Sequence, residues 1–226
     1  MKAIRIKAKQ SMVNYKRPMS YVSGETYPLP PYSTVIGMVH AACGFTSYHP
    51  MKVSVQGDPR SVISDLQTKY FGGSMPYHAN RHNLFVTYEG KKIGYTSGPA
   101  NVELITDIDL ILHIVPDNEE EISLIASSLK KPKNYLALGR HEDLLNILDV
   151  SIVEYHQKDS VQLPNDMYIH PDGQDGTIYK LRKVYTIHPK NHLRGFQEVY
   201  KMLYVGKGTF AFDIFEDEDE YPLCLV

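Results

Sequence analysis

The 226-residue chain is long enough for one large domain or two small ones, and its 42% hydrophobic content with 17 tyrosines indicates a folded, soluble protein. No segment approaches the ~20 consecutive apolar residues of a membrane helix, and the first residues, MKAIRIKAK, contain no signal-peptide core. The two cysteines, Cys43 and Cys224, are too few for a disulfide framework or for zinc held by cysteines. We therefore expect a cytoplasmic protein without membrane contact.

The net charge of −2 conceals an uneven distribution of charged residues. Residues 1–100 contain 12 Lys and Arg against 4 Asp and Glu, a balance of +8, whereas residues 101–226 contain 12 against 22, a balance of −10. A basic half of this kind is typical of a chain that binds a polyanion. The pattern equally fits a fold in which the two halves pack together and their charges intermingle.

The first segment, Lys2 to Lys9, alternates and predicts a half-buried strand. Its basic residues share one face, which we expect to be open and cationic (Arg5, Lys7 and Lys9). A polar loop follows over Gln10–Thr26 and contains Lys16, Arg17 and tyrosines. Basic residues interleaved with aromatic ones suit the phosphates and bases of a nucleic acid, although solvated loops often share this composition.

The block Tyr27–Phe45, YPLPPYSTVIGMVHAACGF, predicts a helix with a rigid proline-rich approach that ends before Gly44. Ser33 or Thr34 can offer a hydroxyl to the free amides of the first turn. The exposed amino end of such a helix suits a phosphate, and the alternative is a well-capped core helix. His40 within this helix is a candidate general base for metal-independent RNA cleavage, or a half-buried packing residue.

After a strand over Met51–Gln56, the segment Ser61–Gly98 predicts a projecting β-hairpin, or thumb, because long insertions in compact domains are often functional. Its basic and aromatic side chains are candidates for RNA contact (Lys69, Tyr70, Tyr77 and Arg81). For Tyr70, packing against a neighbouring protein subunit fits as well. The segment also contains His78 and His82.

Residues 102–155 predict a strand over Val102–Val115, a helix and a second strand over Ile147–Tyr155. We expect Asn118 to cap the helix, with Glu121 in a capping box. Between the helix and the second strand, Gly139 permits a close backbone approach, and Arg140 can bind a phosphate with two donors. A turn carrying a surface arginine is the alternative.

The order of strands and helices predicts an α+β protein with the βαββαβ ferredoxin-like or RNA-recognition arrangement. We expect this domain over residues 1–156, with the thumb inserted at about 61–98. Residues 157–226 contain a proline- and glycine-rich linker, further strands and an acidic run, Glu216–Glu220, which we expect to be a solvated face.

Metal and cofactor sites find little support in the sequence. The pairs His78–His82 and His188–His192 have helical metal-ligand spacing, but each lies in a loop-like sequence without a third ligand beside it. The GKGT sequence at Gly206–Thr209 lacks the upstream glycine of a phosphate-binding loop. We therefore expect no metal and no cofactor.

Two blocks in the first 155 residues, YPLPPYSTVIGMVHAACGF at Tyr27–Phe45 and YLALGRHEDLL at Tyr135–Leu145, carry a family resemblance. Together with the basic first strand and the thumb between them, they resemble the fifth numbered family of CRISPR-associated proteins. This family supplies the subunit of the Cascade complex that caps the 5′ end of the crRNA. The likeness is greatest to the type I-B branch.

The resemblance implies a ferredoxin-like RAMP domain whose helix and glycine-arginine loop hold the crRNA 5′ handle. Its thumb would pack on the backbone subunit, and another face would meet the large subunit and the target DNA near the PAM. Most branches are not enzymes, but the type I-C branch cleaves precursor crRNA with a tyrosine, a lysine and a histidine. The alternative function is therefore an endoribonuclease that uses His40, His78 or His82.

Overall fold

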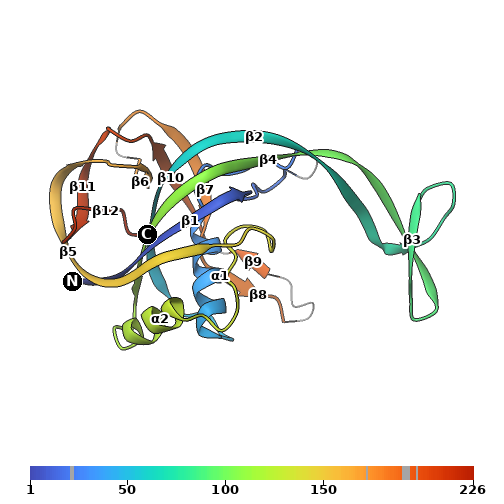
Figure 1. Ribbon diagram of the computed structural model, residues 1–226, viewed down its shortest axis with the longest axis horizontal. Helices are drawn as coiled ribbons and strands as arrows, with labels where there is room; N and C mark the ends of the chain where they lie inside the picture. Colours follow the sequence, from blue (N-terminus) through green and yellow to red (C-terminus); the bar gives the residue numbers. More distant parts are fainter. Residues whose placement is uncertain (21–22, 172, 190–193, 197) are drawn as a thin grey trace.

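The computed structural model describes residues 1–226 except 21–22, 172, 190–193 and 197. Its body is a large antiparallel β-sheet with two helices, from which one long β-hairpin projects (Figure 1). The strands of the main sheet follow the order β12-β11-β5-β1-β4-β2-β6-β10-β7, while β3 pairs with β4, and β8 pairs with β9. The elements are, in chain order, β1 (Lys2–Val13), α1 (Tyr32–Cys43), β2 (Met51–Pro76), β3 (Leu84–Tyr88), β4 (Lys91–Pro116), α2 (Glu121–Lys130), β5 (Asn146–Gln162), β6 (Asp166–Ile169), β7 (Thr177–Arg182), β8 (Tyr185–Ile187), β9 (Arg194–Phe196), β10 (Val199–Val205), β11 (Phe210–Asp217) and β12 (Pro222–Leu223).

The hydrophobic core lies between the sheet and the two helices, which are on the same side of the strands (Figure 1). Alternation along β1 turns Ile4, Ile6 and Ala8 into this core, and α1 contributes Val35 and Val39 to it. In the sheet, β1 lies between β5 and β4, and β2 lies beyond β4, with all of these pairs antiparallel. The expected α+β architecture, a sheet with two helices, is thus confirmed in this coarse form. None of the described helices has the length and apolar character that crossing a membrane requires.

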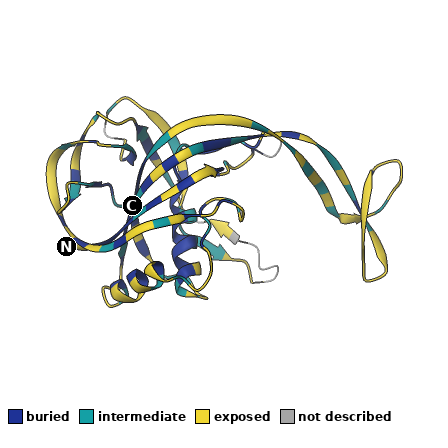
Figure 2. Ribbon diagram, in the orientation of Figure 1, coloured by how far each residue is buried: buried dark blue, intermediate teal, exposed yellow. Residues whose placement is uncertain are grey.

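The long hairpin (residues 51–116) is one continuous pair of strands. β2 and β4 pair from Met51↔Pro116 to Pro76↔Ile93, so the strands expected at 51–56 and 102–115 continue into the segment expected to be an insertion. A turn at Glu89 and Gly90, both with positive φ, joins β3 to β4. The hairpin arches away from the body, and most of its distal residues are exposed (Figures 1 and 2).

The C-terminal region extends the same sheet. β5 runs to Gln162, so residues 157–162, where we expected a linker to begin, form part of a strand. β11 pairs with this extension of β5, and β6 pairs with β2 at Gln56↔Met167. The proline and glycine residues expected to mark the linker (Pro164, Pro171, Gly173 and Gly176) lie between the strands β5, β6 and β7, so the chain there turns within one sheet.

Asp217 departs most clearly from the expectation of a solvated acidic run, because its side chain is fully buried. Its Oδ2 accepts hydrogen bonds from Arg5 Nη1 (2.7 Å) and His113 Nε2 (3.1 Å). Its Oδ1 accepts hydrogen bonds from the backbone N–H groups of Asp219 (3.0 Å) and Tyr221 (2.9 Å). Burial of a carboxylate is tolerated here because charged and polar donors surround it.

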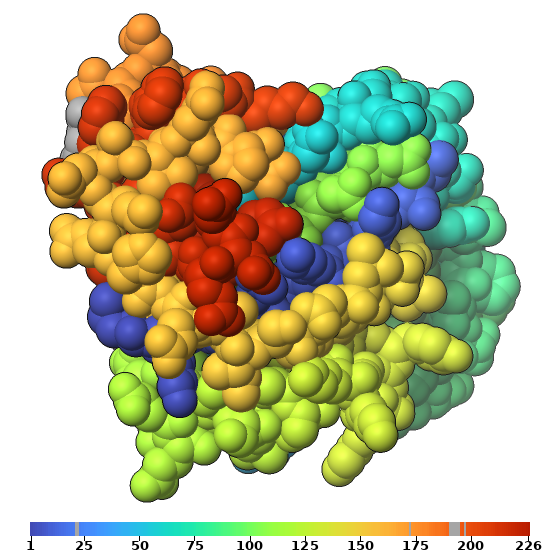
Figure 3. All heavy atoms as spheres, turned by 60° about the vertical axis from the view of Figure 1, so that its left-hand side comes forward, coloured from blue at the N-terminus to red at the C-terminus, as the bar shows by residue number. Residues whose placement is uncertain are grey.

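The chain after Asp217 forms a C-terminal strap (residues 217–226) over the outer face of the sheet. Tyr221 places its ring beneath Lys7 Nζ, 4.6 Å from the ring centroid, and Val226 exchanges two backbone hydrogen bonds with Val53 (3.0 and 3.2 Å). Figure 3 shows the C-terminal residues beside the N-terminal strand. The cationic face of β1 is therefore covered at Arg5 and Lys7, whereas Lys9 is exposed as expected. Acidic and basic residues from opposite halves of the chain intermingle here.

The helix ends partly follow the expectations. α1 ends at Gly44, which is left-handed (φ 71°) and donates its N–H to His40 O, as the glycine predicts. Its N-cap is Pro31, so neither Ser33 nor Thr34 occupies the capping position. Asn118 Oδ1 accepts from Glu120 N (3.2 Å), but Glu121 binds His49 instead of closing a capping box.

Candidate nucleic-acid interface

The glycine-arginine corner after α2 folds tightly against the end of β1. Gly139 has a φ of +123°, and a Cβ there would lie 2.8 Å from Asp143 Oδ2 and 2.9 Å from Val13 Cγ2. The buried Asp143 accepts hydrogen bonds from the backbone N–H groups of Asn14 (3.1 Å) and Arg140 (2.8 Å). Only glycine satisfies both the positive φ and this close approach.

Two buried amides connect this corner with the neighbouring segments. Gln10 Nε2 donates to Leu138 O (2.9 Å) and Asp143 O (3.0 Å), which joins β1 to the corner. Asn14 Nδ2 donates to Gly24 O (2.8 Å) and to the Glu103 carbonyl of β4 (2.7 Å). We call the loop after β1, which contains Lys16 and Arg17, the basic loop. The basic loop, the corner and the base of the long hairpin therefore form one connected unit.

This unit brings together three cations from distant parts of the sequence, which we call the cationic cluster (Lys16, Lys69 and Arg140). Burial lowers the pKa of Lys69, and the positive charges of Lys16 and Arg140 lower it further. A Cβ on Gly24 would lie 3.3 Å from Lys69 Nζ, which places the ammonium over the basic loop. A lysine whose pKa is lowered by neighbouring cations lies at a site that favours an anion.

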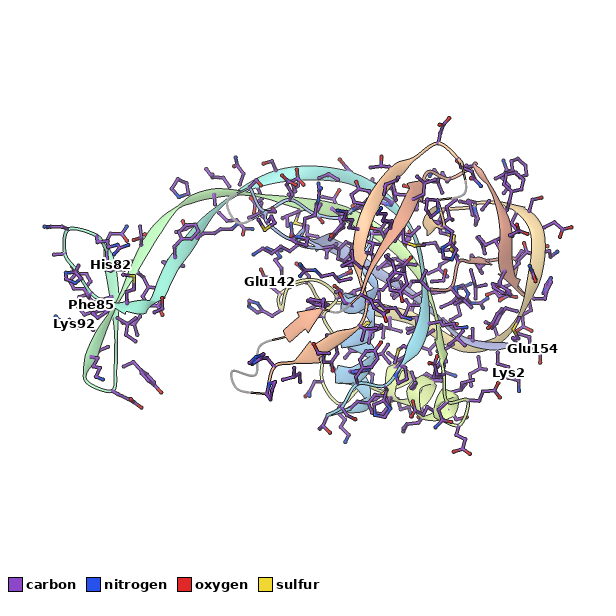
Figure 4. All side chains as sticks on the ribbon, turned by 180° about the vertical axis from the view of Figure 1, so that it is seen from behind. Lys2, His82, Phe85, Lys92, Glu142 and Glu154 are labelled. Atoms are coloured by element: carbon purple, nitrogen blue, oxygen red, sulfur yellow. The ribbon has the colours of Figure 1, made fainter. Side chains whose placement is uncertain are left out.

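Arg140 differs from the expected free phosphate fork. Its Nη2 donates to Asp143 Oδ1 (2.7 Å), its Nε lies within hydrogen-bond distance of both oxygens of the same carboxylate, and its Nη1 pairs with Glu142 (3.0 Å). The hydrogen bond with Asp143 is the main cause of its raised pKa. Glu142 lies beneath the arch of the long hairpin (Figure 4). The corner therefore holds Arg140 in place through ion pairs with Asp143 and Glu142. Lys69, whose pKa is lowered by its surroundings, would gain more from a bound anion.

The residues expected at the thumb lie at two levels of the hairpin. Tyr70 is exposed on β2, beyond Lys69, whereas Tyr77, His78, Arg81 and His82 lie near the tip. Figure 4 labels His82 at this tip, beside Phe85 and Lys92 and away from the body. The structure thus unites Lys69 with the body and separates the tip residues from it.

His82 is a packing residue of the tip. Its Nδ1 accepts from the His78 backbone N–H (3.0 Å), and its ring occupies the space that a Cβ on Gly94 would need, 2.2 Å from Nδ1. Tyr77 packs against Phe85 with ring centroids 5.1 Å apart. Within the described residues no group of three metal-ligating side chains occurs, and His192 of the second histidine pair lies outside them.

The proline-braced start of α1 belongs to the core. Leu29 and Tyr32 are fully buried, and Tyr168 donates to Leu29 O (2.9 Å) and lies 3.3 Å from Leu29 N. Ser33 and Thr34 are half-buried, and Thr34 N is hydrogen-bonded to Pro31 O (2.9 Å). The structure supports a core helix here.

His40 lies in an aromatic cluster with Phe45, Tyr48, His49 and Tyr185. Its ring nitrogens lie 3.3 Å from Tyr185 Oη and 3.3 Å from His49 O, and only 5% of the residue is exposed. It is farther from solvent than the half-buried position we expected, and it does not meet the tip histidines.

Sequence reasoning missed the buried polar residues that build the interface, Gln10, Asn14 and Asp143. Each lies within or beside a segment that reads as polar loop or strand end, and its role depends on backbone partners up to 133 residues away. The only local signal was Asp143 at three positions from Arg140, a spacing that ordinary turns share.

The model of the family described as CRISPR-associated protein (Cas_Cas5) matches residues 3–204. The chain belongs to this family. The match to the CRISPR-associated (Cas_Cas5) family covers both helices, the long hairpin and the strands as far as β10. The resemblance expected from Tyr27–Phe45 and Tyr135–Leu145 is confirmed at the level of the family, and the type I-B branch stays a prediction.

The chain is also similar to solved structures. A chain of a "CRISPR RNA-guided surveillance complex" is 17% identical over 97% of this chain and 91% of that chain, with a TM-score of 0.59, which shows a shared fold. A CRISPR protein from Archaeoglobus fulgidus is 12% identical over 99% and 98% of the two chains, with a TM-score of 0.48. No curated protein matches the sequence.

Proposed function

We propose that this chain is a non-catalytic subunit of a type I CRISPR Cascade surveillance complex, in which it binds and caps the 5′ handle of the crRNA. The strands β1, β2, β4 and β5 with both helices form its ferredoxin-like RAMP domain, and the long hairpin is its thumb. The backbone subunit, the large subunit and the target DNA near the PAM are its other partners, and the branch is type I-B. Family membership and the fold shared with the surveillance-complex chain support this proposal.

The observation that carries the proposal is the convergence of Lys16, Lys69 and Arg140. They come from the loop after β1, from the hairpin and from the corner, three segments that were candidates for RNA contact on sequence grounds. An RNA phosphate bound there would favour the charged form of Lys69 and so oppose the burial and the repulsion that lower its pKa. The buried hydrogen bonds of Gln10 and Asn14 hold the three segments rigidly enough to recognise one strand end.

Replacing Lys69 with Ala tests this function. We expect about tenfold weaker binding of a labelled handle RNA, taken from the repeat of the adjacent CRISPR array, measured by fluorescence anisotropy. The slope of log K against log salt should fall by about 0.7, since one phosphate contact to a single strand is lost. The thermal midpoint should stay equal or rise, because the variant removes a repelling charge.

Lys130→Ala is the matched control, because Lys130 is an exposed lysine at the end of α2. It should bind the handle RNA as the wild type does. Equal affinities for wild type and Lys69→Ala would show that the cationic cluster does not bind the handle RNA and would contradict the proposed role of this site.

A metal-independent endoribonuclease that processes precursor crRNA is the second candidate, and one observation favours it. Lys183, whose pKa is lowered chiefly by burial, is two residues from Tyr185, which lies 3.3 Å from His40. Tyr185 also packs edge-on against Tyr48, 5.5 Å between ring centroids. A tyrosine, a lysine and a histidine thus gather in one region, the residue types that the resemblance implies for the cleaving branch.

Incubation of the purified chain with end-labelled repeat RNA in EDTA separates the two candidates. Under the leading proposal, the RNA stays intact over hours at excess protein. A discrete product that disappears in Tyr185→Phe and in Lys183→Ala, but not in His78→Ala, would instead assign the nuclease activity to the region around His40.

A further inference from the structure

Two adjoining cavities lie between the basic loop and β7, outside the cationic cluster. They have volumes of ≈ 440 and ≈ 450 Å³ and share Arg17, Pro18 and Arg182 in their walls. Lys180 lines the first cavity and Lys16 the second. We call this continuous surface the arginine trough, and Lys16 connects it to the cationic cluster.

The guanidinium of Arg17 lies near two tyrosine rings, those of Tyr27 and Tyr179. Its Cζ lies 6.0 Å from the centroid of Tyr27 and 5.7 Å from that of Tyr179, and its Nη1 pairs with Glu25 (3.0 Å). Arg182 is also fixed by an aromatic contact, with Cζ 4.8 Å from the Phe196 centroid. Contacts with aromatic rings therefore restrict both guanidiniums before any ligand arrives.

The floor of the trough connects the two parts of the chain. Tyr27 Oη donates to the Lys180 carbonyl (2.9 Å), which joins the start of the α1 block to β7. Burial raises the pKa of Tyr27, and the charges of both Arg17 and Arg182 oppose this rise, so both arginines act on the same phenol. The trough thus combines a rigid aromatic floor with two nearby cations.

The charge of this trough separates it from the other large cavity of the described structure. Three carboxylates (Asp58, Asp107 and Asp109) and three cations (Lys9, Arg60 and Lys207) line that cavity. Among the described residues that line the arginine trough, none carries a carboxylate. An anion is therefore stabilised in the trough, whose lining charges are all positive, whereas the charges that line the other cavity balance.

We propose that the arginine trough binds a further phosphodiester of the same single-stranded RNA, with Arg17 and Arg182 on the phosphate. This inference rests on the proposed function, and it extends the RNA path from the cationic cluster through Lys16 to the C-terminal β7. Guanidiniums next to aromatic rings suit single-stranded RNA better than an acidic peptide, because RNA has bases that can stack on such groups and a peptide has none.

Arg182→Ala is the cleanest test, because Arg182 is exposed and the variant leaves the Arg17–Glu25 pair intact. The probe is a fluorescein-labelled 12-nucleotide oligouridine, measured against the purified chain over a series of salt concentrations. We expect about tenfold weaker binding and a salt slope smaller by about 0.7. Arg182→Lys should restore the slope but only part of the affinity, because a lysine keeps the charge and loses the planar fork.

A crosslinking arm locates the strand. With 4-thiouridine in the same 12-mer, irradiation of the wild type should label a peptide that contains Tyr179 as well as a peptide near Lys69. Crosslinks confined to the surroundings of Lys69, or an unchanged affinity of Arg182→Ala, would overturn the proposal that RNA binds in the arginine trough.

The failures of the two proposals are distinguishable. If Lys69→Ala weakens binding while Arg182→Ala and Lys130→Ala do not, the function stands and the trough is wrong. If the wild type binds a labelled 12-residue oligoglutamate more tightly than the oligouridine, and Arg182→Ala abolishes this, the trough docks a protein. Failure of the wild type to bind either RNA probe contradicts both proposals.

Discussion

Replacing Asp217 with Asn is expected to lower the free energy of unfolding by about 3–5 kcal/mol, the usual cost of removing one partner of a buried ion pair. The reason is that the variant leaves the nearly buried guanidinium of Arg5 without its inner partner, and His113 with a weakened acceptor. It also loosens the strap, because Asp217 accepts the backbone N–H groups of Asp219 and Tyr221. Urea denaturation followed by circular dichroism measures the loss, since the chain has no tryptophan.

Asp219→Asn is the matched control. Asp219 also pairs with Arg5 (2.5 Å), but its side chain is 55% exposed, so its loss should cost about 1 kcal/mol or less. Equal losses for the two variants, or a loss below about 1 kcal/mol for Asp217→Asn, would mean that the strap does not depend on the buried carboxylate.

The buried Asp217 carboxyl and its hydrogen-bond donors predict how stability depends on pH. Burial by itself would raise the pKa of the Asp217 carboxyl, but hydrogen bonds from His113, from Tyr221 N–H and from Arg5 outweigh it and hold the pKa at about 2. Because the ordinary value is 3.8, this stabilisation is complete above pH 3.8 and is lost as the pH falls from there toward 2. Wild type should lose stability in this window, and Asp217→Asn should lack this component.

His113 should also make the protein less stable in acid, beginning at a higher pH than Asp217 does. Burial lowers its pKa below the ordinary 6.5 despite the neighbouring carboxylate, so the folded chain keeps this ring neutral while the unfolded chain protonates it. Stability should therefore begin to fall as the pH drops below about 6.5. A folded state equally stable at pH 7 and pH 5 would contradict the assignment of a neutral His113.

Gly139→Ala is expected to destabilise the chain by about 3 kcal/mol, which combines ~1–2 kcal/mol for an L-residue at positive φ with ~1–3 kcal/mol of overpacking. The new Cβ would press against the Asp143 carboxylate (2.8 Å) and Asn14 O (3.1 Å), groups that hold the corner to the end of β1. Handle-RNA affinity should fall together with stability, because Arg140 moves away from Lys69 and Lys16.

Gly208→Ala separates the two contributions in this prediction. Gly208 also has positive φ (85°), but its Cβ would meet nothing within 4 Å. It should lose only the ~1–2 kcal/mol of backbone strain and leave RNA binding unchanged. Chemical denaturation of both variants measures the two losses of unfolding free energy. Equal losses would show that the close packing of the corner does not contribute to the effect of Gly139→Ala.

The sequence by itself determined the local elements with strong short-range signals. Alternation over Lys2–Lys9, the helical spacing after Pro31 with its stop at Gly44, and the apolar run before Pro116 all correspond to β1, α1 and β4. The two diagnostic blocks were likewise enough to place the chain in its family. These signals could be read because backbone propensity, hydrophobic periodicity and turn chemistry act between residues only a few positions apart.

Only the tertiary structure decided which charges remain available to a ligand. Arg5 reads as a cation on an open face, yet its partner Asp217 is 212 residues away, and Arg140 reads as a free fork, yet Asp143 holds it. Conversely, Lys16, Lys69 and Arg140 converge although nothing local connects them. The physical reason is that the pairing register of distant strands sets the positions of charges, and no short-range property of the sequence encodes that register.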